Sequence, residues 1–443
     1  MHRIVETGLY LAIWTAVLAF GGASPPFFFP TQFIILGLGV VVLSASLRTP
    51  DDYNHFPILI PFSLIALVLL QIVPIPVLPG LRSAAPRSAL GWRHSNTLSI
   101  APYQTVSALL LLITYVTTFY LVLWTCERRE AKKRIVYVLL ALGAFEAFYG
   151  LIQYLTGWQQ IFLYVKKYYV QDATGTYINR NHFAGFLEMA LPFAITMGLR
   201  RAGKLRQGIH HSATKARTLL SSPELLALVG LLFVAVTIFA GLVFSRSRMG
   251  ILSSLVSIGM VLALAGSSSP SKRTRAVVAA LFFLGVMGIV VWVGTDPVIN
   301  RFETLGQEYS QAGQNRISIW RDTLKLVRQH PVLGTGLGTF AVAYTSVQTV
   351  FLTQLVDHAH CDYLELASEL GLPGGMLLFG SIFWILASAV RRYRKSEDSF
   401  DSAIRLGCIG SIAAILLHSL ADFNLYIPAN AVVLTVTLAL AWT

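Results

Sequence analysis

The sequence predicts an all-α integral membrane protein with about twelve transmembrane helices. Hydrophobic residues make up 55% of the 443 residues and charged residues only 12%, whereas soluble domains carry about 25% charged residues. The mean hydropathy is +0.64, and runs of about 20 apolar residues recur along the whole length, as expected for helices that cross a bilayer. A helix satisfies its own backbone polar groups, which the lipid interior requires.

Twelve apolar segments have the length and composition of spans. The first follows Arg3, a pattern that also suits a cleaved signal peptide, but no clear A-x-A cleavage site stands behind it. We therefore expect a retained first helix. The predicted spans are 7–23, 31–47, 56–78, 104–125, 135–157, 182–199, 224–244, 250–266, 276–294, 371–390, 406–421 and 426–443.

The distribution of positive charge predicts the orientation of these spans. The formal net charge is +13. If the N-terminus is cytoplasmic, the larger share of Lys and Arg falls on that same side, as the positive-inside rule requires. The basic tract 200–206 is then a topology determinant that faces anionic lipid. We expect membrane lipids as partners of this charge, and no nucleic acid.

The chain is predicted to form one membrane domain, 1–443, with a long outer loop, 295–370, between the ninth and tenth spans. Loops of this length are functional or disordered, and this one contains its own amphipathic helix at 315–329. Such a helix lies on the membrane surface or caps the bundle. Its apolar stripe is Ile317, Trp320, Leu324 and Val327, and its basic flank is Arg321, Lys325 and Arg328.

A glycine-rich run, 334–338, follows Pro331 and ends that helix. It superficially resembles a nucleotide-binding loop, but it has neither the spacing nor a preceding strand. The short inner loops hold no Walker-type motif, so we expect neither ATP nor any other cofactor. The three cysteines, Cys126, Cys361 and Cys408, do not indicate a disulfide framework.

Three arginines lie at the outer ends of predicted helices. Arg180 precedes the sixth span, and Arg246 and Arg248 lie in the sharp turn between the seventh and eighth spans. Free N–H groups and the helix dipole favour anions at helix N-termini, and a guanidinium binds phosphate with two hydrogen bonds. We interpret Arg180 and Arg246 as a site for a diphosphate group. The alternative is that these arginines reach lipid phosphates.

Two histidines, His358 and His360, lie at the end of the long outer loop. Near neutral pH an imidazole can take a proton from a hydroxyl group, which favours a general base. A metal site would require further ligands such as Asp362 and Glu365, and ordinary surface histidines are the third interpretation. We expect Asp362 to cap the helix that follows and to orient an imidazole.

Four ionisable residues lie inside or near the spans, where such groups are paired or functional. Two of them, His418 and Asp422, are four residues apart and should face the same way on one helix. They form either a local structural pair or a supporting part of the site. The other two are Glu146 and Glu188, and the neighbours of Arg180 that could support the site are Asn179, Asn181 and His182.

Five motifs, taken as a set, resemble the bacterial O-antigen ligase and O-antigen polymerase superfamily. Each motif alone is a weak signal, and together they cover roughly residues 100–430. They are Gly175–Gly185 (GTYINRNHFAG), Ser245–Gly250 (SRSRMG), Arg316–Phe340 (RISIWRDTLKLVRQHPVLGTGLGTF), His358–Gly371 (HAHCDYLELASELG) and His418–Asn424 (HSLADFN).

The resemblance implies a twelve-helix glycosyltransferase of the GT-C type in the bacterial inner membrane, with its active site facing the periplasm. Its donor would be a glycan linked to undecaprenyl diphosphate, and it would need neither ATP nor a metal ion. The acceptor would be lipid A–core in a ligase, or a second lipid-linked glycan in a polymerase. A chain-length regulator is a candidate partner. An O-linked protein oligosaccharyltransferase and a lipid-linked glycan transporter are the remaining alternatives.

The resemblance also implies roles for individual residues. In the ligases, the proposed base belongs to a loop motif of His, then Asn, Ser or Gln, then two residues and Leu. Here that motif falls on His360, Cys361 and Leu364, which favours a ligase, although Cys361 departs from the usual residue types. His358 is the second catalytic candidate. The arginines that bind the diphosphate correspond to Arg180 and Arg246, followed by Arg248 and Arg316.

Overall fold

The computed structural model describes residues 1–46, 56–74, 97–211, 222–265, 280, 314–349, 355–396 and 398–443. Within these residues the chain is almost entirely helical, apart from an antiparallel hairpin of β1 (Gln160–Ile161) and β2 (Tyr164–Val165). Eight helices of the described part are long and apolar enough to cross a membrane. The expected class, a helical integral membrane protein, is therefore confirmed.

Each expected span that lies within the described residues, or mostly within them, overlaps an α-helix. The span expected at 276–294 falls outside the described residues, apart from residue 280. The eight candidate spans are α2 (Pro25–Ser46), α4 (Pro102–Thr125), α5 (Arg129–Thr156), α6 (Arg180–His211), α8 (Pro223–Phe244), α9 (Arg248–Ala265), α15 (Asp362–Lys395) and α16 (Ser399–His418). The shorter apolar helices are α3 (Leu59–Ile72) and α17 (Pro428–Trp442), and the chain begins with the 17-residue helix α1 (His2–Leu18).

Helix α6 is the centre of the bundle. It packs against α16, α8, α9 and α5, and its most apolar stretch is completely buried. Small residues bring its neighbours close, because a Cβ at Gly410 of α16 would lie 2.8 Å from Pro192, and one at Gly250 of α9 would lie 2.6 Å from Ala184. Such close approach is how helices associate in lipid. The central helix begins at Arg180, so this arginine is fixed at one end of the bundle.

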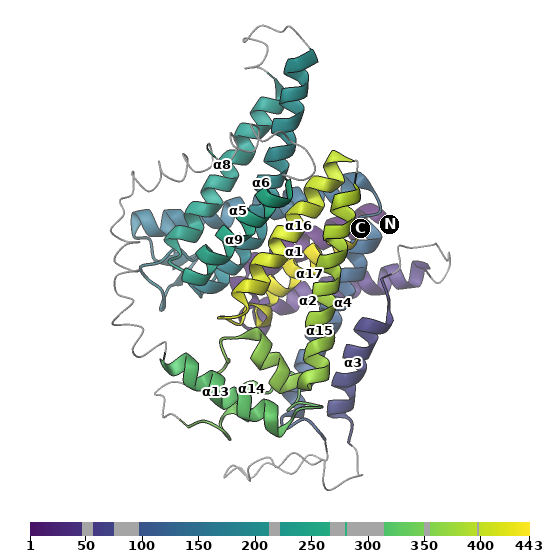
Figure 1. Cartoon of the computed structure of the whole chain (residues 1–443). Coiled ribbons are helices and arrows are strands. Elements are labelled where there is room, and N and C mark those ends of the chain that lie inside the picture. The colour runs from purple at the N-terminus through teal and green to yellow at the C-terminus, as the bar shows by residue number, and fades with distance from the viewer. Residues whose placement is uncertain are drawn as a thin grey trace.

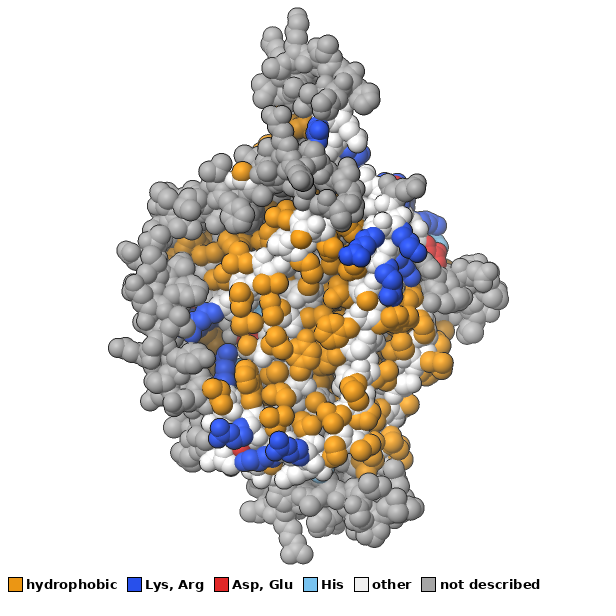
Figure 2. Space-filling view, in the orientation of Figure 1, with side chains coloured by type: hydrophobic (Ala, Val, Ile, Leu, Met, Phe, Trp, Pro, Cys, Tyr) orange, Lys and Arg blue, Asp and Glu red, His pale blue; other side chains and the backbone are white. Residues whose placement is uncertain are grey.

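The antiparallel course of the helices divides the polar loops between two ends (Figure 1). One end holds the start of α5, the end of α15 and the start of α16. An ion pair of 3.0 Å between Arg129 and Asp398 links the start of α5 to the start of α16. The other end holds the segment before α6, the turn between α8 and α9, and the turn after α16. Figure 2 shows a broad band of hydrophobic side chains across the middle of one face.

The amphipathic helix of the long loop is confirmed as α13 (Gln314–Gln329), which packs against α15. It lies with the short helix α14 (Phe340–Tyr344) at one end of the bundle (Figure 1). The two helices share a small core with the segment before α15. Trp320 Nε1 donates a hydrogen bond to Ala359 O at 2.9 Å, so α13 directly supports the loop that carries the two histidines.

The predicted apolar stripe of α13 is partly wrong. Ile317 and Leu324 are 49% and 41% exposed, whereas Ile319, Asp322 and Leu326 are buried. The buried face is rotated because Asp322 turns inward, where its carboxylate accepts hydrogen bonds from the Thr349 backbone N–H at 2.9 Å and the Lys325 ammonium at 2.8 Å. A polar residue with buried partners does not show in a hydrophobicity pattern, which is why the pattern misplaced this face.

The glycine-rich run is a site of close backbone contact with α15. A Cβ at Gly334, whose φ is +66°, would lie 2.1 Å from Glu369 O, and Gly336 N donates to the same oxygen at 3.1 Å. The side chain of Gln71 in α3 adds hydrogen bonds to Leu333 O at 2.7 Å and to Glu369 O at 2.8 Å. Glycine is needed here for left-handed backbone and close approach, and the long loop is thereby fixed to the bundle.

Candidate active site

Arg180 and Arg246, predicted from separate motifs, converge on one buried carboxylate. Arg180 Nη1 lies 2.8 Å from Asp172 Oδ2, and Arg246 Nη1 lies 3.3 Å from Asp172 Oδ1. Asp172 is 3% exposed, while the two guanidinium side chains retain 18% and 19% exposure. The start of α6 is fixed by Asn179, whose Oδ1 accepts a hydrogen bond from Asn181 N at 2.8 Å. Two cations from distant segments are thus held side by side.

The segment that carries Asp172 is anchored through its backbone. Lys166 Nζ donates to Asp172 O at 2.8 Å, and Asp172 N donates to Tyr169 O at 3.1 Å. Ala173 N donates to Phe244 O at 3.0 Å, which ties the segment to the end of α8. Burial lowers the pKa of Lys166 to about 8, against the opposing effect of Asp172. Lys166 is therefore a third cation close to the arginine pair.

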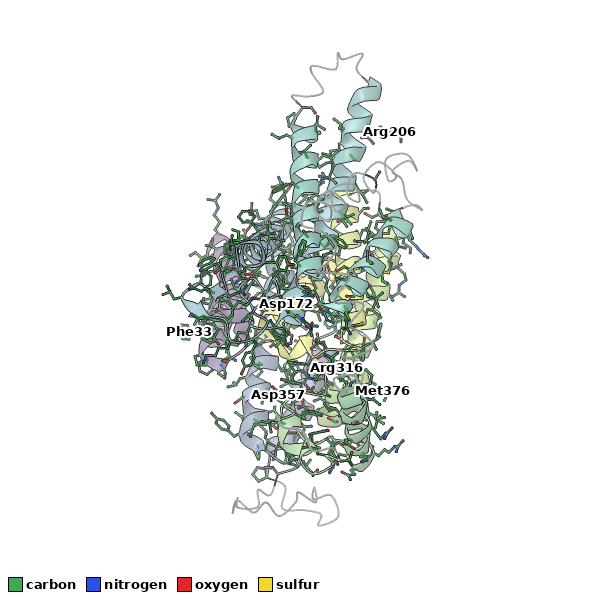
Figure 3. All side chains as sticks on the ribbon, turned by 90° about the vertical axis from the view of Figure 1, so that its left-hand side faces the viewer. Phe33, Asp172, Arg206, Arg316, Asp357 and Met376 are labelled. Atoms are coloured by element: carbon green, nitrogen blue, oxygen red, sulfur yellow. The ribbon has the colours of Figure 1, made fainter. Side chains whose placement is uncertain are left out.

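Tyr169 lies between the arginine pair and the histidine loop. Its backbone has φ +54°, and the Arg180 guanidinium lies over its ring, 5.2 Å from the centroid. Its phenol also interacts electrostatically with Arg316 and Asp422. Figure 3 shows Asp172 and Arg316 in the middle of the molecule, with Arg206 toward the far end of α6. Tyr169 thus packs against the arginine pair, close enough to Asp422 and Arg316 for their charges to affect its phenol.

His360 faces Asp422 across the second half of the site. His360 Nδ1 lies 3.9 Å from Asp422 Oδ1, and His182 Nε2 lies 3.8 Å from the same oxygen. The carboxylate is buried, which by itself raises its pKa, but the neighbouring imidazoles of His360 and His182 hold the pKa of Asp422 well below its usual range. Asp422 is thus a stable anion between an imidazole of α6 and one of the long loop.

The backbone at His360 is left-handed, with φ +52°. Such a conformation costs a non-glycine residue about 1 to 3 kcal/mol and is concentrated at functional sites. Arg246 and Tyr169 share this feature, with φ values of +57° and +54°. Three of the residues with left-handed backbone in the described chain therefore belong to one site. Their common location supports a functional reason for this strain.

His358 is held as a cation. Its Nδ1 lies 2.7 Å from Glu365 Oε1, and its side chain is mostly buried. Burial opposes the charged form, but the Glu365 carboxylate outweighs burial and raises the pKa of His358 to about 9. At neutral pH this imidazole is therefore protonated, which suits it for binding an anion and not for accepting a proton.

Phe423 packs against all three histidines. Its ring is stacked on His358 with centroids 4.0 Å apart, and it makes edge contacts to His360 at 5.1 Å and His182 at 4.6 Å. Phe423 is 8% exposed. Aromatic contacts of this kind fix ring orientation, so the adjacent residues Asp422 and Phe423 together position the imidazoles of His182 and His360.

The expected pair of His418 and Asp422 on one helix face is wrong. Helix α16 ends at His418, and Asp422 lies in the turn beyond it. The His418 imidazole instead faces Glu188 of α6, with 3.0 Å between Nδ1 and Oε2, and Ser253 donates to the same carboxylate at 2.6 Å. The turn separates the two residues, so Asp422 reaches the site while His418 stays inside the bundle.

The expected role of Asp362 as a helix cap that orients an imidazole is also wrong. Asp362 is the first residue of α15, and Cys361 takes the N-cap position. The Asp362 carboxylate accepts hydrogen bonds from Ser419 Oγ at 2.7 Å and from Leu425 N at 3.2 Å. It therefore fixes the turn that carries Asp422 and affects the site only through the position of that turn.

The other predicted arginines lie at the edges of the site. Arg316 of α13 donates from Nη1 to Ala421 O at 3.2 Å, beside Asp422. Arg248 begins α9, two residues after Arg246. In the described part of the chain, no three His, Cys, Asp or Glu side chains are arranged as a metal site.

The sequence did not single out several residues that the structure places at this site. These residues, Lys166, Tyr169 and Asp172, lie between α5 and α6, in a segment that none of the five motifs includes. Only the structure indicates that these residues belong to the site, through the left-handed backbone of Tyr169 and the burial of Asp172. The sequence predicts Glu365 only as a possible metal ligand, and it assigns no role to Phe423, which lies within the motif His418–Asn424.

The segment that matches a known protein family contains some of the residues of this site and not others. Residues 233–379 match the family model of the O-antigen ligase. The matched segment contains Arg246, Arg316, His358 and His360, whereas Arg180 and the turn after α16 lie outside it. No curated protein matches the chain. The match to this segment supports the resemblance to the O-antigen ligase and polymerase superfamily that the motifs predicted.

Proposed function

We propose that this protein is a membrane glycosyltransferase that moves a glycan from undecaprenyl diphosphate to an acceptor hydroxyl at the periplasmic face. The proposal rests on two pairs of residues at the same end of the helices: the arginine pair held by Asp172, and the pair of His360 and Asp422. An arginine pair suits a diphosphate leaving group, and an imidazole beside a carboxylate suits proton abstraction.

The arginine pair has N–H donors left over that could bind an anion. Each guanidinium gives one Nη1 to Asp172. Within the described residues, the Nε atoms of Arg180 and Arg246 are also buried without a hydrogen-bond partner. A buried donor that lacks an acceptor is costly, so phosphate oxygens would relieve this cost. Arg316 and the protonated His358 would add positive charge nearby.

The proposed reaction is an inverting transfer of the glycosyl group. His360 accepts the proton of the acceptor hydroxyl, and that oxygen bonds to the anomeric carbon as the bond from this carbon to the diphosphate oxygen breaks. The electron pair of the broken bond stays on the diphosphate, whose charge Arg180 and Arg246 stabilise. Asp422 stabilises the imidazolium that forms on His360, as carboxylates do in related general-base pairs.

Several features support a site on the periplasmic side. The basic residues of 129–134, 200–206 and 391–405 lie at the opposite end of the helices from Asp172 and His360. By the positive-inside rule such an end faces the cytoplasm, so we propose that the N-terminus is cytoplasmic. A bacterial inner-membrane location and a GT-C type fold follow from the same proposal.

The most favoured acceptor is lipid A–core, which would make the protein an O-antigen ligase. The alternative is an O-antigen or exopolysaccharide polymerase, whose acceptor is a second lipid-linked repeat. A protein oligosaccharyltransferase and a transporter of lipid-linked glycan rank lower. A transporter would be expected to place its polar residues near the bilayer midplane, whereas the arginines and histidines of this site gather at one end of the bundle.

The test uses purified protein in nanodiscs, as wild type, His360→Ala and the control His330→Ala. Undecaprenyl-diphosphate-linked glycan is added with or without lipid A–core, and products are resolved by gel and mass spectrometry. We expect a glycan–core adduct with wild type and His330→Ala that is lost with His360→Ala. A ladder formed without the core would indicate a polymerase. If no glycosidic bond forms with an intact native donor, the proposal is wrong and a transporter becomes the better explanation.

A further inference from the structure

The Asp172 carboxylate occupies the space between the two guanidinium groups of the proposed diphosphate site. Its Oδ2 faces Arg180 at 2.8 Å and its Oδ1 faces Arg246 at 3.3 Å. With 3% exposure it is shielded from water, so its charge acts at full strength on its neighbours. An enzyme that only needed to bind an anion would gain nothing from a buried carboxylate at this point.

The carboxylate is not needed to hold its own segment. The backbone of Asp172 is anchored by Lys166 Nζ and by Tyr169 O, and the next residue is anchored by Phe244 O. Four residues further on, Thr176 N donates to the Glu146 carboxylate at 2.8 Å. The hydrogen bonds of the Asp172 side chain run instead to the two guanidinium groups. Its function therefore concerns the charge of the arginine pair.

Charge matters here because the reaction changes the charge of the diphosphate. In the donor both phosphate groups are esterified, so the diphosphate carries two negative charges. After transfer the terminal phosphate is a monoester, whose second ionisation has a pKa of about 6, and the product approaches three charges at neutral pH. Two arginines without a counter-ion would hold the product more tightly than the donor, and product release would become slow.

We propose that Asp172 is a positioning residue that lowers the affinity of the arginine pair for the lipid diphosphate product and so permits its release. The proposal rests on the proposed function. The carboxylate holds both guanidinium groups in place through their Nη1 atoms and leaves their Nε atoms for the substrate. It also repels the third charge that the product gains, so it discriminates product from donor.

The experiment measures direct binding of undecaprenyl diphosphate to full-length protein in nanodiscs, together with kcat and KM for the donor. The variants are Asp172→Asn, Asp172→Glu and the control Asp398→Asn, which removes an equivalent charge at the opposite end of the bundle. Asp398 caps α16, and Asn caps helices as well as Asp does. We expect Asp172→Asn to bind undecaprenyl diphosphate on the order of tenfold more tightly, with a lower kcat. Asp172→Glu and Asp398→Asn should resemble wild type.

The pH dependence of binding separates this role from a structural one. The dissociation constant of wild type divided by that of Asp172→Asn should become smaller below about pH 6, where the product loses its third charge. The other charged or ionisable groups that interact with Asp172 are Arg180, Arg246, Lys166, Tyr154 and Tyr169. None of these cations or phenols changes its charge between pH 5 and 7.

Three results would overturn the inference. Unchanged or weaker binding of undecaprenyl diphosphate to Asp172→Asn would mean that the carboxylate only positions the arginines. Tighter binding with a ratio independent of pH would exclude discrimination by the third charge. If wild type and Asp172→Asn both fail to bind undecaprenyl diphosphate and to use the donor, the proposed function itself is wrong. A circular-dichroism melt of each variant separates these results from misfolding, and Asp172→Ser is a second variant that removes the charge if Asp172→Asn is unstable.

Discussion

The carboxylate of Asp422 faces the imidazole of His360 at 3.9 Å, although one lies in the turn after α16 and the other at the end of the long loop. This spacing is slightly longer than a hydrogen bond, and catalytic hydrogen bonds often tighten only when substrate binds. Asp422 also holds His182 at 3.8 Å. The pair joins the segment that matches the O-antigen ligase model to a residue outside it.

Asp422→Asn should lower kcat by about 10²- to 10³-fold with little change in KM for the donor, because it removes the anion that stabilises protonated His360. The measurement is steady-state transfer to the acceptor, with Asp398→Asn as the matched control. Asn keeps the size of the side chain, so the Phe423 contacts should survive. Wild-type turnover in Asp422→Asn would show that His360 acts without this carboxylate.

The pair of His358 and Glu365 should make stability depend on pH. The folded-state pKa of His358 is about 9, above the ordinary value of about 6.5. The stabilisation is therefore fully present below about pH 6.5 and is lost as the pH rises to 9. We expect wild type to lose on the order of 2 kcal/mol across this window, and Glu365→Gln to lose much less.

Thermal melting in detergent between pH 6 and 9.5 measures this effect. His330→Ala should keep the slope of the wild type, since His330 lies in the same loop region but outside the pair. An equal slope in wild type and Glu365→Gln would show that the ion pair does not form in solution. Transfer activity at pH 7 should also fall in Glu365→Gln if charged His358 helps to hold the diphosphate.

The sequence predicted the helices better than the contacts between them. Apolar runs locate spans because lipid demands about 20 apolar residues, and Arg180, Arg246 and His360 were recognisable because each lies in a motif at a helix end. Asp172 and Asp422 could not be assigned from the sequence in the same way. The partners of Asp172 lie on two other segments, and those of Asp422 include the His360 loop. Such contacts follow from tertiary packing, which a local pattern does not contain.

The two wrong assignments at the site have local physical causes, as does the rotated buried face of α13. His418 and Asp422 were placed on one face because their spacing fits a continuous helix, but α16 ends at His418. Asp362 was expected to be a cap because Asp favours that position. The helix begins one residue earlier than expected, so that Cys361 becomes its N-cap.

Cys361→Ser should stabilise the protein by about 0.5 to 1 kcal/mol, because a serine hydroxyl is a better N-cap acceptor than a thiol. Cys361 has the extended backbone of an N-cap, with φ −162°, but makes no side-chain cap hydrogen bond. Burial raises the pKa of its thiol, so it stays uncharged at neutral pH. Melting temperature and transfer activity of Cys361→Ser and Cys361→Ala test this expectation. If Cys361→Ser melts no higher than Cys361→Ala, the position does not act as a cap.

Tyr169 offers a test of whether the two halves of the site act together. Its ring packs against the Arg180 guanidinium at 5.2 Å, and its phenol interacts with Arg316 and Asp422. Tyr169→Phe keeps the aromatic face, so donor KM should change less than about twofold. Any decrease in kcat would measure the contribution of the phenol hydroxyl. Tyr169→Leu removes the cation–π contact, which contributes about 0.5 to 2 kcal/mol, and should raise donor KM by roughly 3- to 30-fold.

The matched control for Tyr169 is Tyr168→Leu, because Tyr168 is its chain neighbour and is 63% exposed. Tyr168→Leu should leave KM and kcat at wild-type values. The comparison also separates binding from chemistry: if Tyr169 only packs under Arg180, Tyr169→Phe will match wild type in both constants. If the phenol takes part in the arrangement of Arg316 and Asp422, kcat will fall while donor KM stays constant. Equal KM values for Tyr169→Leu and wild type would mean that Arg180 is held by Asp172 alone.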